Sequence, residues 1–260
     1  MLRLVKTELK KLKRKRFVSF VVFAAILFPI PATILAIRGG FGNMSEFDGI
    51  FQMLISYAEP IMLPCMLGVI SSMLFIMEKD NDTLKNLCVI PISMKKIASA
   101  KLCVIFIFGL AFSLLTALSA IVGGLVAGGV ISGVFQKLGI AIITGALYSI
   151  GTLPVVIAIV FFDKSYIFSI ILTVFYSIFG FSLMSVGLGV NTPLMRLLKS
   201  IIPAPVIYRW QASLFVTEKA SYYEIIKPYF LSLPIVLLVI GIIGGLSFLA
   251  IVTIYKKREI

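Results

Sequence analysis

The sequence predicts an all-α, polytopic membrane protein with six transmembrane helices, and three observations support this fold class. Of its 260 residues, 60% are hydrophobic and only 13% are charged, whereas soluble domains carry about 25% charged residues. Several apolar runs reach about 20 residues, the length with which an α-helix crosses roughly 30 Å of hydrocarbon. Nearly all of the chain is taken up by these runs and the connections between them, so we expect no separate soluble domain.

The distribution of basic residues predicts the orientation of the spans. We expect spans at residues 17–37, about 58–77, 102–122, about 138–162, 166–188 and 230–255. With both termini in the cytoplasm, the cytoplasmic segments hold 17 Lys and Arg and the external segments hold seven. This asymmetry satisfies the positive-inside rule. The basic residues of 189–229, which this arrangement places outside, are its weakest point.

Residues 1–16 are predicted to form a cytoplasmic, amphipathic basic helix, separate from one transmembrane domain at 17–260. The segment holds eight basic residues and one acid, Glu8. Its apolar residues recur at three- and four-residue spacing: Leu2, Val5, Leu9 and Leu12. Two interpretations carry equal weight, namely a helix on the anionic membrane surface and an ordinary positive-inside anchor.

The chain lacks the residue patterns that ATP hydrolysis, metal binding and common kinds of catalysis require. No P-loop pattern occurs, so we expect no ATP hydrolysis by this chain. Histidine is absent, and the cysteines have no metal-ligand spacing and read as small core residues. We therefore expect no catalytic residue, no metal and no bound cofactor. Because the basic residues follow the topology, we expect no nucleic-acid partner.

The predicted spans carry no ionisable residue at mid-depth, since Glu59 lies near the outer end of the second span. Ion-coupled carriers usually bind the driving ion with buried carboxylates. This disfavours an ion-coupled carrier, although ion sites built from backbone alone leave it open. Small polar residues of the spans either line a transport path or mediate helix packing, the commoner role: Ser113, Thr116, Ser119, Thr144, Ser149, Thr152, Ser177, Ser182 and Ser185.

Two long polar connections interrupt the apolar runs. Residues 78–101 carry clustered charges of both signs and are long enough for a short helix and a second helical start, with Ser93 as an N-cap. This segment is either a docking surface or a solvated loop. Residues 189–229 are rich in aromatics, which favours an external segment at the membrane interface. Its candidate substrate or interface residues are Tyr208, Arg209, Trp210, Phe215, Tyr222 and Tyr223.

Several motifs together resemble the permease subunits of type-2 ATP-binding-cassette (ABC) exporters. They are Glu8-Leu9-Lys10-Lys11 through Arg16, the acidic Glu78, then Asp82-Thr83-Leu84, Pro91-Ile92-Ser93 and the closing Lys101. The later Pro203-x-Pro205, followed by Tyr208-Arg209-Trp210, is similar to the bacitracin-export and lantibiotic-immunity branch. One departure is Asp82-Thr83, where the family often has Gly-Thr, and an Asp still caps a helix.

The resemblance implies a coupling helix in 78–101 that fits a groove on a separate cytoplasmic ABC ATPase. The residues implied in ATPase coupling are Glu78, Lys79, Asp80, Asp82, Thr83, Leu84, Lys85, Leu87 and Cys88. It also implies two ATPase copies that bind ATP and Mg, and a second permease chain, identical or related. The expected setting is the bacterial cell membrane, with its lipids as further partners.

The function implied is export or removal of an antimicrobial peptide of the lantibiotic or bacitracin type, giving self-immunity or resistance. Two other functions stay open. The chain is alternatively a membrane sensor or scaffold that recognises a peptide or lipid without transport. The third candidate, an ion-coupled carrier, is disfavoured by the apolar spans.

Overall fold

The protein is all-helical in the residues that the computed structural model describes, which are 1–13, 23, 25–42, 44–76, 92–162, 165–186, 192–216, 218, 220 and 223–256. Five helical stretches there are long and apolar enough to cross a membrane: Glu46–Phe75, Met94–Val126, Val134–Phe162, Tyr166–Ser185 and Leu233–Lys256. The first predicted span lies partly outside the described residues. Its described part is the shorter apolar helix Ala25–Gly39.

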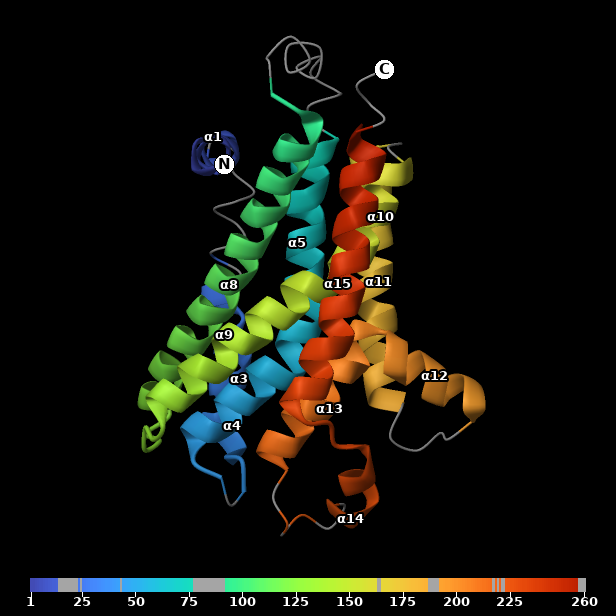
Figure 1. Cartoon of the computed structure of the whole chain (residues 1–260). Coiled ribbons are helices and arrows are strands. Elements are labelled where there is room, and N and C mark those ends of the chain that lie inside the picture. Colours follow the sequence, from blue (N-terminus) through green and yellow to red (C-terminus); the bar gives the residue numbers. More distant parts are fainter. Residues whose placement is uncertain are drawn as a thin grey trace.

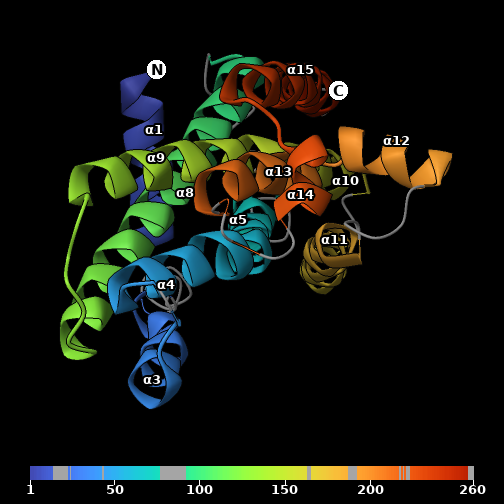
Figure 2. The ribbon, with the colours of Figure 1, turned by 90° about the horizontal axis from the view of Figure 1, so that it is seen from below.

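The long helices α5 (Glu59–Phe75), α11 (Tyr166–Val186) and α15 (Leu233–Lys256) run side by side, and α9 (Val134–Gly151) crosses them (Figure 1). The shorter α10 (Leu153–Phe162) is also upright, with α8 (Met94–Val126) inclined beside the others. Helix α1 (Leu2–Lys13) is seen end-on in Figure 1 and along its length in Figure 2, so it lies across the bundle. The start of α8 and the end of α15 lie at the same end of the bundle as α1.

The second span is entered through a bend. Helix α3 (Pro29–Gly39) begins at a proline, and α4 (Glu46–Met53) begins where the Ser45 side chain accepts a hydrogen bond from the Asp48 backbone N–H. A π-helical turn, η1 (Leu54–Ala58), then joins α4 to α5. Figure 2 shows α4 lengthwise and α5 end-on, so the chain turns at η1. A separate helix therefore precedes α5.

The third span confirms the sequence prediction, because Ser93 stands at the N-cap of α8, which continues without interruption to Val126. Close packing against α9 (Val134–Gly151) depends on glycines. A Cβ added at Gly109 would lie 1.8 Å from Ser149 Oγ, and one at Gly145 would lie 2.7 Å from Ser113 Cβ. Small residues thus bring these two helices together, as is common in membranes.

The fourth crossing consists of two helices that meet at Thr152. The amide of Val155 bonds to the Thr152 carbonyl, and Pro154 has no N–H to offer the preceding turn. The Gly151 carbonyl instead accepts a hydrogen bond from the Tyr176 hydroxyl of α11. A side chain from another helix therefore satisfies the backbone at the break between α9 and α10.

The second long connection does not lie wholly at the surface. Helix α13 (Pro203–Phe215) is inserted among the long helices, and its Val206, Ile207, Trp210 and Gln211 are buried. Helix α12 (Pro193–Ile201) exposes Leu194, Leu197 and Ile201, whereas Lys199 is only 7% exposed. The short α14 (Tyr223–Ile226) and η2 (Lys227–Tyr229) lead to α15. The aromatic density that indicated an interfacial segment thus belongs partly to the core.

Apolar side chains cover the outside of the bundle as well as its core. The larger core cluster includes Leu67, Phe75, Leu102 and Trp210. Large apolar residues on α11 and α15 are nevertheless exposed, among them Ile171, Phe175, Leu238 and Leu246. An exterior of this kind suits lipid rather than water as the solvent. The fold is that of a multi-pass membrane protein.

Candidate functional site

A buried lysine joins four helices at the α1 end of the bundle. Lys101 on α8 is fully buried, and its Nζ lies 3.7 Å from Glu8 Oε2 on α1. The ammonium group also donates a hydrogen bond to the Leu74 carbonyl of α5. It lies 5.3 Å from the ring centroid of Phe75 and 5.8 Å from that of Tyr255 on α15. These five residues form the Lys101 junction.

The contacts of the junction explain how a charge is tolerated there. A buried ammonium group is costly unless a charge partner and hydrogen-bond acceptors surround it. Glu8 supplies the opposite charge and is itself held by Lys11, at 2.7 Å. The rings of Phe75 and Tyr255 pack edge to face, 5.4 Å apart, and offer their π-systems to the cation. The junction therefore fixes α1 to the ends of α5, α8 and α15.

The amphipathic stripe predicted for the amino terminus is present in part. Leu12 is buried, and Val5 and Leu9 pack against the core, but Leu2 is 87% exposed. Leu2 instead lines an apolar groove of about 460 Å³ between α1 and the long helices. The buried face of α1 is thus mixed, because Glu8 lies on it and pairs with Lys101.

The predicted coupling residues all lie outside the described residues: Glu78, Lys79, Asp80, Asp82, Thr83, Leu84, Lys85, Leu87 and Cys88. Only the two flanks of their segment are described, namely the end of α5 and the residues from Ile92 onward. Within the second flank, Lys95 and Lys96 are exposed, whereas Lys101 is buried. Lys101 was predicted only as the polar end of this segment.

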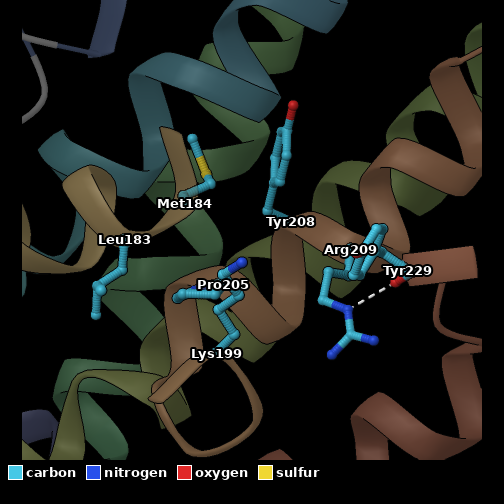
Figure 3. Close-up of a pocket in the computed structure, with 7 residues that line it drawn as sticks. All are labelled: Leu183, Met184, Lys199, Pro205, Tyr208, Arg209 and Tyr229. Carbon is cyan, nitrogen blue, oxygen red and sulfur yellow. Dashed lines mark hydrogen bonds between the residues drawn. The ribbon is translucent and has the colours of Figure 1, made fainter. Parts of the chain in front are cut away.

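A small pocket on α13 brings together some of the predicted external residues (Figure 3). It is lined by Leu183, Met184, Lys199, Pro205, Tyr208, Arg209 and Tyr229. Arg209 Nε donates a hydrogen bond to the Tyr229 carbonyl at 2.6 Å, and Lys199 Nζ lies 6.0 Å from the Tyr229 ring centroid. Burial lowers the pKa of Arg209, and the interaction with Tyr229 partly offsets this. The pocket presents cations beside an aromatic ring.

The other predicted external residues do not converge on this pocket. Trp210 is buried in the main core. Phe215 packs edge to face on Phe51, with centroids 6.1 Å apart, and Tyr223 packs on Phe230 at 5.9 Å. Tyr222 lies outside the described residues. In Figure 3, Tyr208 and Arg209 point in different directions, and the Tyr208 ring lies 6.4 Å from that of Tyr57.

A buried carboxyl group is the feature that sequence reasoning missed. Glu59, predicted near the outer end of the second span, is the first residue of α5 but lies within the continuous helical stretch Glu46–Phe75, and it is only 1% exposed. Its Oε1 lies 2.7 Å from the hydroxyl of Ser113, a residue in the middle of α8. The signal in the sequence was an acid within an apolar run, which in membranes marks a functional site by default.

The fold and these polar contacts define a helical membrane protein with buried charges at its helix contacts and no groups of three or more potential metal-ligand side chains within the described residues. The family model of ABC-2 family transporter proteins matches residues 4–180. The chain belongs to this family, whose members are membrane subunits of ABC transporters with the ATPase as a separate partner. A search among curated proteins found no match.

Proposed function

We propose that this chain is the membrane subunit of an ATP-driven exporter in which the ATPase docks on residues 78–101. The Lys101 junction is the observation that carries the proposal. Leu74 and Phe75 of the junction lie a few residues before that segment, and Lys101 lies at its end. The docking segment is therefore anchored at both flanks to one buried cation.

The junction would pass a displacement of the docking segment to the rest of the bundle. Lys101 contacts α1 through Glu8 and α15 through Tyr255. A buried ion pair resists separation, because removing one partner leaves an uncompensated charge. The ends of the four helices would thus move together when the ATPase pulls on the segment.

The proposed energy source lies on the partner. Two ATPase copies bind ATP and Mg, and their closure moves the coupling helices of two permease chains, which are either identical or related. The coupling is between two sites with distinct states, and this chain performs no catalysis itself. The membrane is proposed to be that of a bacterial cell, with both termini and residues 78–101 on the cytoplasmic side.

The proposed substrate is an antimicrobial peptide of the lantibiotic or bacitracin type, whose removal gives immunity or resistance. The motif Tyr208-Arg209-Trp210 supports this branch by resemblance. The pocket on α13 adds chemical support, since Arg209 and Lys199 offer hydrogen-bond donors beside Tyr229. Such groups suit the carbonyl oxygens of a peptide backbone.

Purification in mild detergent tests the partnership. An ABC ATPase should co-purify from native membranes, and its ATP hydrolysis should depend on this chain. Leu84→Asp or Leu87→Asp should abolish the dependence of ATP hydrolysis on this chain. Each variant would place a charge in the groove of the ATPase that the docking segment is proposed to fill with apolar side chains. Ser200→Asp, at an exposed polar position of α12, is the control and should change nothing. The proposal fails if no ATPase co-purifies, or if both docking variants keep transport unchanged.

A further inference from the structure

Three oxygen atoms near the start of α5 are buried and have no hydrogen-bond partner among the described residues. They are Glu59 Oε2 on α5, the Tyr148 hydroxyl on α9 and Gln211 Oε1 on α13. The exposed fractions of these residues are 1%, 1% and 0%. A buried polar atom without a partner costs about 1–3 kcal/mol. Three such atoms on three helices therefore indicate a missing ligand rather than a packing defect.

Four hydrogen bonds place Glu59 and Gln211 against α9 and the turn before α5. Ser113 Oγ lies 2.7 Å from Glu59 Oε1 and 2.8 Å from the Ala141 carbonyl of α9. Gln211 Nε2 reaches the Ile55 carbonyl and Thr144 Oγ1, each at 3.4 Å. We call Glu59, Ser113, Thr144, Tyr148 and Gln211 the carboxyl cluster.

The spacing along the helices brings Glu59 toward Tyr148. Ile55 and Glu59 are four residues apart, as are Thr144 and Tyr148, so each pair lies about one helical turn apart on one face. Gln211 links the first member of each pair. Helices α5 and α9 pack against each other, so the second members lie on the same side of this helix contact.

The backbone contributes to the same region. The Ile55 carbonyl belongs to the π-helical turn η1, which ends immediately before Glu59. Single π-helical turns inside helices occur frequently at functional sites, where they free backbone groups from the regular ladder. Here the turn presents a carbonyl to Gln211 and orients its amide, so that Oε1 is left as the acceptor.

Counting hydrogens shows what kind of ligand completes the cluster. The two N–H groups of the Gln211 amide donate to the Ile55 carbonyl and to Thr144 Oγ1, and the single hydroxyl hydrogen of Ser113 is shared between two acceptors. Glu59 Oε2 and Gln211 Oε1 remain as acceptors, and the Tyr148 hydroxyl oxygen, which also carries a donor hydrogen, can accept as well. No ion pair to Glu59 occurs among the described residues. A primary ammonium group supplies three donors and one positive charge, which matches both the unmet acceptors and the carboxylate.

We infer that the carboxyl cluster binds a primary ammonium group, with Glu59 as its charge partner and Gln211 and Tyr148 as further acceptors. Tyr148 also lines a cavity of about 10 Å³ between Pro60 and Tyr176, which has room for one group the size of water or ammonium. The group comes either from an amphipathic amine or from free ammonium in solution. This inference goes beyond the exporter function and needs no ATPase.

The only tryptophan of the chain makes the inference directly measurable. Trp210 is buried and adjacent in sequence to Gln211, so its fluorescence reports on the cluster. The full-length chain in lipid nanodiscs is titrated at neutral pH with octylammonium, which is charged there. Octanol is the neutral control for the alkyl chain, and ammonium chloride tests the free cation. We expect a saturable change in emission with octylammonium and none with octanol.

Two variants identify the residues responsible. Glu59→Gln keeps the size of the side chain but removes its charge, and should weaken binding at least tenfold. Ser113→Ala removes the hydroxyl that positions Glu59 and should weaken binding about tenfold. Ser113→Ala also keeps the test decisive if Glu59→Gln does not fold.

The outcomes separate the two sources of the ligand. Saturation by ammonium chloride at similar concentrations identifies free ammonium, and saturation by octylammonium alone identifies an amphipathic amine. The inference is overturned if neither cation gives a saturable change, or if Glu59→Gln binds octylammonium as well as the unmodified chain does. Since these measurements use no ATPase, their failure would leave the proposed docking of the ATPase intact.

Discussion

The Lys101 junction and the carboxyl cluster both place an ionisable side chain between α5 and α8, but at opposite ends of α5. Lys101 has a carboxylate, a carbonyl and two aromatic rings around its charge. Glu59 has the Ser113 hydroxyl on one oxygen and no partner on the other among the described residues. The charge of Lys101 has an opposite charge beside it, although Glu8 Oε2 has no hydrogen bond among the described residues, whereas Glu59 Oε2 has neither a charge partner nor a hydrogen bond there.

This difference separates two uses of buried charge in a membrane protein. A satisfied charge resists displacement and suits a mechanical link between helices. An unsatisfied one raises the free energy of the conformation that holds it, until a ligand supplies what is missing. The three predictions that follow test whether the two regions differ in this way.

Loss of the junction charge should have the largest effect on stability. Lys101→Met leaves Glu8 buried with Lys11 as a charge partner, and removes the hydrogen bond to the Leu74 carbonyl. We expect a loss of about 3 kcal/mol, seen as a fall of about 10 °C in the midpoint of thermal unfolding. Lys95→Met, at an exposed position of the same helix, is the control. Equal midpoints for the two variants would contradict the role of the junction.

A change in helix packing should have an intermediate effect and should act on the carboxyl cluster. The added Cβ of Gly145→Ala would lie 2.7 Å from Ser113 Cβ and 3.1 Å from the Gly109 carbonyl. We expect a loss of about 1–3 kcal/mol from overpacking, together with weaker octylammonium binding because Ser113 is displaced. Gly139→Ala, where nothing lies within 4 Å of the new Cβ, should keep both properties. Thermal unfolding and Trp210 fluorescence measure the two effects.

Neutralising the unsatisfied carboxyl should have the smallest effect on stability. Glu59→Gln removes a buried ionisable group and keeps a side chain that hydrogen-bonds to Ser113. We expect the unfolding midpoint of the ligand-free protein to change by the equivalent of about 1 kcal/mol or less. A fall as large as that of Lys101→Met would show that Glu59 has a strong partner within the protein, and the contrast between the two regions would disappear.

Much of the helical layout followed from local features of the sequence. Ser93 before an apolar run predicted the start of α8, and apolar residues at three- and four-residue spacing predicted α1. These features act over a few residues of chain. Short motifs likewise predicted the ABC-2 family, and the assignment to the bacitracin and lantibiotic branch stays a prediction.

The buried polar sites could not be read from the sequence, because their partners lie far away along the chain. Lys101 resembled the polar end of a connection until α1 and α15 were seen to cover it. Glu59 was predicted near the end of its span, but it lies within the helical stretch Glu46–Phe75, and Gln211 contacts that stretch at Ile55 from a segment interpreted as external. Its burial also weakens one argument used against ion coupling, since a buried carboxyl group is present in the membrane domain after all.

The break at Thr152 has a mechanical consequence. In an unbroken helix, bending costs backbone hydrogen bonds, but here the Gly151 carbonyl is already satisfied by Tyr176 rather than by its own helix. We therefore expect the fourth crossing to bend at Thr152, between α9 and α10. Hydrogen bonds from the Thr152 N–H to the Tyr148 carbonyl and from the Val156 N–H to the Thr152 carbonyl remain at this break, so we expect bending there to cost less than in an unbroken helix without being free.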